Sequence, residues 1–499
     1  MKQHGRCVLP ADETGRVLDR LTALEKVISP TDIRQALVDT GRVNPRACKL
    51  THEVMMWVVL AMGIFTNLPI RQVFKQARRL RVPADTPCRS ALCVARQRLG
   101  VEPVQQLFER TVRPLATPET PGAFYYGMRL VAVDGTLLDV PDTSANDASF
   151  GRPTSGKRGD GAFPQVRKLS LVEVGTHVEF ALCTASYRTG ERTMFPRLLP
   201  HLRAGMLLLC DRGFFSYKLW KSVVPRGVHV LARLSKGMVL EKIEQLSDGS
   251  YLAKIYANSY DRKKDRRGIV VRVIKYTLND SQRVGHQEEH TLLTDLLDET
   301  KYPAWELIPG YHWRWEHELV YAEQKTYQDP PRASKPTHLR SETPTGVLQE
   351  IYALSLAHFA IRSLMFQAAK RAGLDTDRLS FTGSFQILKC RLPECDSQTR
   401  QSFEAWCEGL LDEMSHEQIE PRRNRINPRV IKRKMKNWLK KRPEHRHLPP
   451  LKKTFMESVV MTISTVLTLT LSQREKGFAI DDLKTRTQIS DHTPGTGTG

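Results

Sequence analysis

The sequence lacks the long apolar runs of a membrane protein. The longest strongly apolar run near the N-terminus, residues 54–65 (VMMWVVLAMGIF), has 12 residues, whereas a membrane-spanning helix needs about 20. A second run, residues 458–473, is interrupted by Ser and Thr and indicates a buried or uncertain segment. Residues 1–15 contain neither an apolar core nor a cleavage site, so nothing signals secretion. We therefore expect a cytoplasmic protein with no membrane partner.

Cysteine is sparse and follows no known pattern. The nine cysteines are an odd number, and the nearest pairs, Cys88/Cys93 and Cys390/Cys395, are separated by four residues rather than two. This spacing fits neither a disulfide framework nor a zinc ribbon, and it indicates a reducing compartment. The Gly-x-Ser-x-Gly turn that exposes a hydrolase serine is also absent. Serine hydrolase chemistry is therefore not expected.

Positive charge, by contrast, is in large excess. The 499 residues, enough for about three domains, include 76 Lys+Arg and 54 Asp+Glu, a net charge of +22. Residues 421–453 alone hold 14 Lys or Arg and one acid. Such a cluster favours a polyanionic partner, because each neutralised phosphate releases a counterion; the alternative is a solvated tail. We predict that Lys432, Arg433, Lys434 and Lys436 bind DNA phosphates.

Residues 16–110 have the pattern of a helical domain. Helix start and stop signals occur at Ser29, Pro30, Gly41 and Thr51. A proline-containing turn leads to a further helix at residues 89–99, which carries Arg96 and Arg98 near its end. Because two helices joined by a short turn can enter a DNA groove, we predict DNA binding by Arg96 or Arg98. They do not share a helical face, so only one would enter; alternatively, these helices are merely packed.

Strand patterns begin near residue 128 and alternate with helical ones. Two strands meet around Gly175 and Thr176, and a helix is expected over residues 191–202. This alternation predicts an α/β core, interrupted by a strand-rich insertion. The predicted divisions are an N-terminal tail (1–15), a helical DNA-binding domain (16–115), a first core part (125–235), a β-rich insertion (236–296), a second core part (297–400), a helical and basic segment (401–453) and an uncertain, partly disordered tail (454–499).

Two short motifs resemble a phosphate-binding loop and a metalloprotease site, but neither lies in the structural context that such a site needs. Residues 151–158 (GRPTSGKR) approach a phosphate-binding loop, but Arg158 stands where that loop needs a hydroxyl. Residues 286–290 (HQEEH) match a metalloprotease pattern, but they run into the strand-like HTLLT rather than lying on a helix. A flexible basic loop and a charged strand entry are the expected structures.

Two acids are predicted to end short apolar strands, Asp134 in LVAVDGT and Asp211 in LLLCDRGF. The carboxyl edge of an α/β sheet is the usual place for ligands. Two carboxylates there can share Mg²⁺, a hard ion that prefers oxygen ligands. Acids at strand ends are common, so this pair alone supports a metal site only weakly.

A third pattern is more specific. Residues 311–325 fit Y-x2-R-x3-E-x6-K at every position, through Tyr311, Arg314, Glu318 and Lys325. On one continuous helix these four residues form a single stripe. An amphipathic helix with paired charges is the simpler interpretation. A stripe that joins an acid, two cations and a phenol is better suited to facing phosphates.

With this stripe, the chain resembles the DDE transposases of the bacterial IS-four insertion-sequence group. The resemblance covers residues 15–440 and includes LTALEKVISPTDIRQALVDTGR, VAVDGT, LLLCDRGF and the Y-R-E-K stripe. It implies an RNase H-like catalytic core with a β-rich insertion before the last catalytic acid. Asp134, Asp211 and Glu318 are then the catalytic and metal-binding acids, and Glu350 is a rival for the third place. Residues 454–499 do not resemble the family.

The resemblance also implies a reaction. Mg²⁺, with Mn²⁺ as a substitute, would serve hydrolysis of a DNA strand at the element's end, and the freed 3′-OH would then attack target DNA. Arg314 and Lys325 would position phosphates, and Tyr311 would contact a phosphate or a displaced base. A hairpin intermediate, a homodimer on the terminal inverted repeats and a nucleoid location when bound to DNA are further expectations. The alternatives are a domesticated or inactive DNA-binding protein and a structure-selective RNase H-like nuclease.

Overall fold

The computed structural model describes residues 21, 24–44, 48, 50–77, 86–155, 159–235, 238, 240–281, 286–330, 337–395, 399–421, 430–431, 439–440, 453–462 and 468–470. The chain divides into two compact units. Unit 1 comprises Met1–Met238, Tyr256–Gly268 and Gly310–Arg423, and unit 2 comprises Val239–Ile255, Ile269–Pro309 and Asn424–Gly499. Among the residues described, no helix is both long and apolar enough to cross a membrane.

Unit 1 begins with the expected helical region. Its helices are α2 (Pro30–Asp39), α3 (His52–Ile64), α4 (Ile70–Ala77), α5 (Arg89–Leu99) and α6 (Glu102–Thr111). The start signals act as predicted, because the side chains of Ser29 and Thr51 accept hydrogen bonds from backbone amides of the first turns of α2 and α3. Every residue of α3 from Val54 to Ile64 is buried. The apolar run that is too short for a membrane is therefore a core helix.

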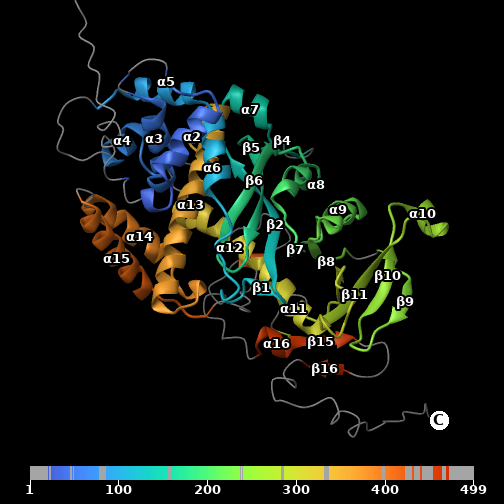
Figure 1. Ribbon diagram of the computed structural model, residues 1–499. Coiled ribbons are helices and arrows are strands. Elements are labelled where there is room, and N and C mark those ends of the chain that lie inside the picture. Colours follow the sequence, from blue (N-terminus) through green and yellow to red (C-terminus); the bar gives the residue numbers. More distant parts are fainter. Residues whose placement is uncertain are drawn as a thin grey trace, which may run out of the picture. The chain divides into compact units, whose positions relative to one another are not determined.

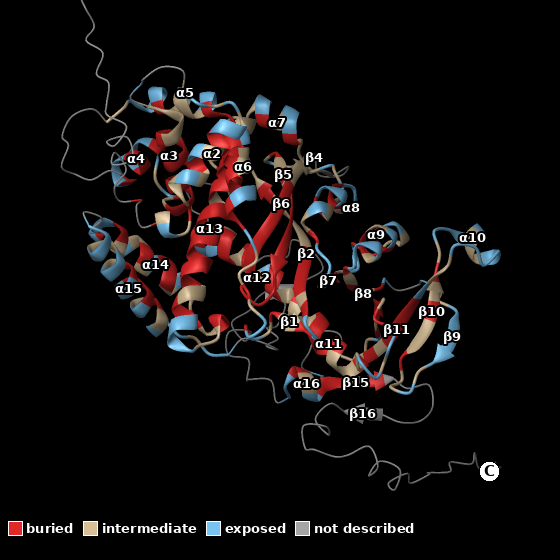
Figure 2. Ribbon diagram, viewed as in Figure 1, coloured by how far each residue is buried: buried red, intermediate tan, exposed pale blue. Residues whose placement is uncertain are grey.

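The long helix α13 (Pro344–Ala372) is the centre of the packing in unit 1. It contacts α3 and α6 on one side and strand β6 (Val178–Ser186) on another, and it is buried along most of its length (Figure 2). The contact with α3 is made backbone to backbone, since a Cβ on Gly63 would overlap the carbonyl group of Ala353. Glycine is required where two helices approach this closely.

A mixed sheet lies beside these helices (Figure 1). Within unit 1 its strand order is β8–β7–β2–β5–β6. The strands are β2 (Met128–Asp139), β5 (Gln165–Glu173), β6, β7 (Met206–Cys210) and β8 (His229–Arg233), with the short β1 (Phe124–Tyr125) paired to β2. Strands β2, β7 and β8 are parallel, whereas β5 and β6 are antiparallel. The hairpin predicted around Gly175 joins β5 to β6, and the sheet fits the RNase H-like core that the sequence implied.

Two predicted helices are broken. The helix expected over residues 191–202 is a short α8 (Glu191–Met194) followed by the 3₁₀ turns η2 (Phe195–Arg197) and η3 (Leu199–His201). Pro196 and Pro200 explain the break, because proline donates no backbone hydrogen bond. The region expected to form one helix carrying the Y-R-E-K stripe is divided into four consecutive elements. They are α11 (Ala304–His312), the 3₁₀ turn η5 (Trp313–Trp315), α12 (Glu316–Ala322) and the π-helical turn η6 (Glu323–Gln328).

Unit 2 contains the remaining strands of the larger sheet. Strand β11 (Ile269–Leu278) pairs with β10 (Tyr251–Ile255), β12 (His290–Thr294) and β15 (Val459–Thr462), while β9 (Lys242–Gln245) pairs with β10 and β16 (Thr468–Thr470) with β15. The HQEEH motif thus enters a strand, as predicted. The C-terminal tail, expected to be uncertain, contributes α16 (Phe455–Ser458) and β15 to this unit.

The remaining elements complete both units. They are α7 (Ser144–Phe150), β3 (Thr154–Ser155), β4 (Gly159–Asp160), α9 (Tyr217–Val223), η4 (Val224–Arg226), α10 (Ser259–Lys263), η7 (Thr376–Arg378), α14 (Phe381–Arg391), η8 (Leu392–Glu394), α15 (Arg400–His416), β13 (Val430–Ile431) and β14 (Leu439–Lys440). In the segment predicted to be helical and basic, α15 is helical, but the described residues beyond it include the strands β13 and β14, which pair in parallel.

Candidate active site

Asp134 and Asp211 are brought to the same place by the sheet. Strands β2 and β7 pair in parallel up to Val133 and Cys210, and each acid is the next residue along its strand. Asp134 does not end its strand as predicted, because β2 continues to Asp139 in antiparallel pairing with β5. Only the pairing with β7 ends there. The two acids therefore still lie side by side at one edge of the sheet.

The carboxylate of Asp211 is fixed by the turn that follows it. Its Oδ1 accepts hydrogen bonds from the backbone amides of Gly213 (2.8 Å) and Phe214 (3.1 Å). Asp134 is held differently: its Oδ1 accepts from the amide of Gly135 at 2.8 Å. Burial raises the pKa of Asp134, and nearby Arg314 opposes that shift.

Glu318 joins this edge through Arg314. The Arg314 guanidinium lies 3.7 Å from Asp134 Oδ2 and 3.5 Å from Glu318 Oε1. The Arg314 side chain is 8% exposed, that of Asp134 19% and that of Glu318 46%, so Glu318 forms the open side of the group. Burial acts against the charged guanidinium, but Tyr311 and the two acids raise the pKa of Arg314 above its usual value. The stripe predicted from sequence does face the predicted acids.

Tyr311 and Lys325 have less open surroundings than expected. Tyr311 is buried, which raises its pKa to about 12, although Arg314 and Arg233 lower it. Lys325 donates to Thr136 Oγ1 and to the carbonyl of Leu137, both at 3.1 Å, and burial lowers its pKa. Lys325 is thus tied to the strand that carries Asp134, and Tyr311 is enclosed by the protein.

Hydrogen bonds attach α12 to the strand that carries Asp134. The Tyr321 hydroxyl donates to the backbone carbonyl of Asp134 at 2.7 Å. Ser170, the neighbour of Asp134 on β5, contacts Tyr321 at 3.1 Å and His317 Nε2 at 3.2 Å. Burial lowers the pKa of His317 to about 4, so it is neutral in this position. These contacts fix α12, and with it Glu318, in position relative to the strand that carries Asp134.

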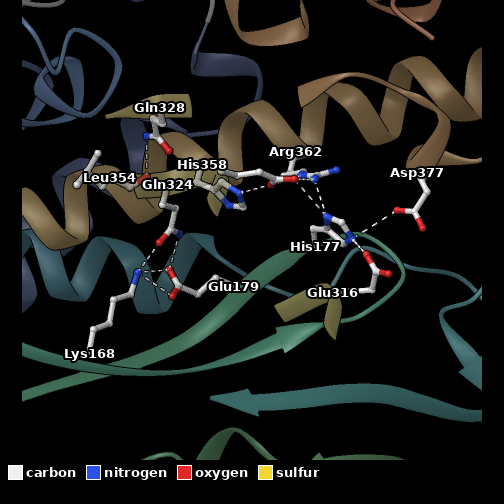
Figure 3. A network of polar contacts seen from close by, with 11 residues as sticks. Lys168, His177, Glu179, Glu316, Gln324, Gln328, Leu354, His358, Arg362 and Asp377 are labelled. Atoms are coloured by element: carbon white, nitrogen blue, oxygen red, sulfur yellow. Dashed lines mark hydrogen bonds and ion pairs between the residues drawn. The ribbon is translucent and has the colours of Figure 1, made fainter. Parts of the chain in front are cut away.

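Unit 1 also contains a dense buried polar network (Figure 3). Lys168 Nζ bonds Glu179 Oε1 (2.7 Å), Gln324 (2.8 Å) and Ser355 (3.0 Å). In a second group, Glu323 pairs with Arg362 and accepts from His358 Nε2 at 2.8 Å. These buried charges are matched by partners, which is the condition for tolerating them inside a protein.

The second group continues to His177, which points toward Glu316 and Asp377 (Figure 3). Among the described residues, only His177, Glu316 and Asp377 bring three potential ligand atoms within 4.8 Å of one another. However, His177 Nε2 hydrogen-bonds Glu316 Oε2 at 2.8 Å. That bond uses Nε2 as a donor to a carboxylate, and a metal ion would have to displace its proton. We assign this group to structural support because each member already has a partner in the buried network.

The predicted acids do not form such a tight cluster, but they suit a different kind of metal site. Asp134, Asp211 and Glu318 offer only carboxylate oxygens, the ligands preferred by Mg²⁺ and Mn²⁺. Two-metal sites spread their ligands over ions about 3.5–4 Å apart. Arg314 stands between two of the acids and offsets their mutual repulsion. The donor set and its position therefore fit divalent metal ions.

The two N-terminal arginines differ sharply. Arg96 donates to Gln349 (2.8 Å), Ser341 (3.0 Å) and the Gly346 carbonyl (2.6 Å), so it is committed to the interior of unit 1. DNA binding by Arg96 is thereby corrected to a structural role. Arg98 is exposed and lines a cavity of about 470 Å³ between α5 and the side chains of Asn44, Cys48, Leu50 and His52. Arg98 keeps the DNA-binding prediction.

Glu350, the rival third acid, belongs to the same interior cluster as Arg96. Its carboxylate accepts hydrogen bonds from Ser341 Oγ at 2.5 Å and from the Arg340 amide at 2.9 Å. Arg96 lies 3.7 Å from it. These partners give Glu350 a structural role, in line with the packed helix expected from the sequence.

Two predicted sites cannot be placed. Lys432, Arg433, Lys434 and Lys436 lie outside the described residues, as do residues 156–158 of the phosphate-loop-like motif.

The sequence analysis overlooked Glu191, whose carboxylate lies against Gly135 and pairs with Arg167 at 2.8 Å. No sequence signal distinguishes Glu191 from other acids that begin a helix.

Family comparisons agree with this geometry. Residues 18–109 match the family "Insertion element 4 transposase N-terminal", and residues 125–358 match the family "Transposase DDE domain". The second match contains Asp134, Asp211 and Glu318. Both matches were expected from the motifs.

Individual relatives extend the match. The chain is 30% identical over 419 residues to the transposase InsG for insertion sequence element IS4 from Escherichia coli K12, covering 83% of this chain and 92% of InsG. It is 24% identical to the putative transposase InsZ of the same organism, over 50% of this chain and 89% of InsZ. A piggyBac transposase synaptic complex with hairpin DNA, solved by cryo-electron microscopy, aligns at a TM-score of 0.39 and 10% identity, covering 80% of this chain and 86% of that one. The chain belongs to the IS4 family of DDE transposases, metal-dependent enzymes that cut and transfer DNA in transposition.

Proposed function

We propose that Asp134, Asp211 and Glu318 are the catalytic acids of this transposase and hold Mg²⁺, with Mn²⁺ as a substitute. The observation that carries the proposal is the meeting of Asp134 and Asp211 where β2 and β7 stop pairing, with Arg314 joining Asp134 to Glu318. Bound divalent ions supply charge stabilisation at phosphorus and a more acidic water. The two reactions are hydrolysis of a strand at the element's end and attack of the freed 3′-OH on target DNA.

The cationic side chains hold the DNA strand in place. Arg314 borders both Asp134 and Glu318, and a guanidinium can bind two phosphate oxygens at once. Lys325 is held by Thr136 and Leu137, two and three residues beyond Asp134, so its ammonium group lies at a fixed position along β2. Together they orient the scissile phosphate toward the acids.

Tyr311 has a supporting part in this proposal. The sequence predicted that Tyr311 contacts a phosphate or a displaced base. Its ring is buried, and its hydroxyl lies close enough to Arg314 for each to shift the other's pKa. We assign to Tyr311 the role of orienting the Arg314 side chain. The hydroxyl of a buried tyrosine that faces a guanidinium limits the rotamers of that guanidinium.

DNA binding is distributed over other parts of the chain. Arg98, on the exposed side of α5, contacts the element's terminal inverted repeats. Lys432, Arg433, Lys434 and Lys436 grip phosphates without regard to sequence. Replacing these four by Gln should weaken binding equally for cognate and random duplexes. The same change should flatten the salt dependence by roughly one unit for each phosphate that the protein no longer neutralises.

Two further points complete the proposal, one on the insertion and one on the oligomeric state. The strand-rich residues 236–296 are an insertion in the catalytic core, placed before Glu318 in sequence. Because two element ends must be joined together, the working form on DNA is a homodimer. Size measurement of the complex with both ends bound, by light scattering, tests the second point.

The decisive experiment incubates the full chain with DNA carrying both element ends, target plasmid and Mg²⁺. We expect 3′-OH ends, hairpin ends and joined products on a gel. Cleavage without joining would favour a nuclease, and binding without cleavage would favour a decayed transposase. Omission of the divalent ion should stop cleavage and leave end binding, since Arg98 and the basic segment need no metal.

A further inference from the structure

Glu191 lies directly beside the residue that follows Asp134. It is the first residue of α8, just after strand β6. The backbone of Gly135 and the Glu191 carboxylate are so close that a Cβ on residue 135 would overlap Oε1. Only glycine at position 135 leaves room for the carboxylate in this place. The side chain of Glu191 therefore extends over β2 at the edge where the catalytic acids meet.

The next residue along α8 reaches the other strand end. Arg192 Nε donates to the backbone carbonyl of Gly213, and the amide of Gly213 donates to Asp211 Oδ1 at 2.8 Å. Glu191 and Arg192 thus attach the start of α8 to both β2 and the Asp211 turn. Two consecutive side chains fix α8 across the gap between the two acids.

Carboxylates gather at this edge of the sheet. They belong to Asp134, Asp211, Glu318 and Glu191. Among the described residues, Arg314 pairs with Asp134 and Glu318, and Arg167 pairs with Glu191. Carboxylates held this close repel one another, and a divalent ion at this edge would offset that repulsion.

We propose that Glu191 is a fourth carboxylate of the metal-binding edge and helps to retain the divalent ion beside Asp134. Arg167 positions it, with Nη1 2.8 Å from Oε1 and Nη2 donating to the carbonyl of Tyr187 at 3.2 Å. The inference rests on the proposed assignment of Asp134, Asp211 and Glu318. The competing interpretation is an ion pair between Glu191 and Arg167 that serves folding alone.

The test measures Mn²⁺ binding to the full-length chain by the loss of the free Mn²⁺ signal in electron paramagnetic resonance. Glu191→Gln should weaken Mn²⁺ binding roughly tenfold or more, as changes around metal ligands do, and Glu191→Asp should restore part of it. Gly135→Ala should weaken binding in the same way, because the new methyl group displaces the Glu191 carboxylate. Glu244→Gln, at an exposed position on β9, is the matched control and should change nothing.

Further measurements separate the possible failures. The Mg²⁺ concentration for half-maximal cleavage should rise in Glu191→Gln, while the rate at saturating Mg²⁺ falls less. Unchanged Mn²⁺ binding and Mg²⁺ dependence, together with a lowered melting temperature, would assign Glu191 to folding and overturn the inference. If Asp134→Asn loses Mn²⁺ while Glu191→Gln keeps it, only this inference fails. If Asp134→Asn also keeps Mn²⁺, the proposed catalytic acids themselves are wrong.

Discussion

The segment from α12 to the π-helical turn η6 has two sides with opposite electrostatics. On the interior side, Glu323 and Gln324 are buried and bonded to partners on the sheet and on α13. On the other side, Glu318 is 46% exposed and shares Arg314 with Asp134. The interior side pairs its charges and fixes the segment, whereas the open side leaves the Glu318 carboxylate accessible, as its proposed role at the metal requires. The comparison shows how one short segment can hold a rigid interior and still present an accessible carboxylate.

The largest expected effect comes from removing charge on the open side. Asp134→Asn and Glu318→Gln each remove a metal-binding charge and keep the volume of the side chain. Strand cleavage should be lost, with a residual rate at least a thousandfold lower, about 4 kcal/mol of activation free energy. Binding to the element end should stay within about threefold of the wild-type affinity. Single-turnover cleavage and gel-shift assays on the same preparations measure both. Wild-type cleavage by Asp134→Asn would refute the assignment of the acids.

The second effect comes from breaking the interior side. Glu323→Gln leaves the buried Arg362 guanidinium without its carboxylate partner. Breaking a buried pair costs about 3–5 kcal/mol, so the urea unfolding midpoint should fall strongly and soluble yield should drop. Glu318→Gln is the matched control, with the same chemical change on the same segment and no expected loss of stability. Equal stability of the two variants would remove the distinction between the two sides.

A third, smaller effect separates the two arginines of α5. Arg96→Gln should destabilise unit 1 by about 1–3 kcal/mol, because it removes the donor that Arg96 supplies to Gln349 Oε1 and to the Gly346 carbonyl. Arg98→Gln should leave stability within about 0.5 kcal/mol and weaken binding to the cognate end. Thermal melting and gel shifts test both variants. Intact stability of Arg96→Gln with lost end binding would return Arg96 to the DNA interface.

The smallest effect is a pH dependence of the interior side. Burial and Arg362 lower the pKa of His177, but hydrogen bonds to Glu316 and Glu323 raise it to about 9. A folded-state pKa above the unfolded value near 6.5 means that protonation stabilises the fold below pH 6.5 and that this stabilisation is lost as pH rises through about 9. Urea midpoints should therefore fall between pH 6.5 and 9. His177→Gln should flatten that slope, and an unchanged slope would contradict it.

Local signals in the sequence account for much of the fold. Ser29 and Thr51 begin helices because their oxygens cap nearby amides. The edge that holds Asp134 and Asp211 follows from two apolar runs that each stop at an acid. The pairing of Arg314 with Glu318 follows from their i, i+4 spacing in the stripe. In these cases the information lies within a few residues of the feature.

Features set by distant partners could not be predicted. Strand β2 passes beyond Asp134 because β5 continues to pair with it, and the direction of Arg96 depends on residues 341–350. Strand β15 pairs with β11, nearly two hundred positions earlier in the chain. The position of Glu191 near Asp134 becomes apparent only from its contact with Gly135 in the structure. In each case the local structure depends on a contact between segments that are far apart in the chain. A single sequence does not show which distant segments meet.

The contact of α3 with α13 has a mechanical consequence. Gln328, at the end of the π turn that carries Lys325, donates to the carbonyls of Gly63 on α3 (2.9 Å) and Leu354 on α13 (3.0 Å). Thr66, just after α3, donates to the carbonyl of Gln328 at 2.9 Å. These bonds attach α3, in the helical region proposed to recognise the element end, to the segment proposed to hold the cut phosphate. We therefore expect the fold to fix the offset in base pairs between the recognised sequence and the cut.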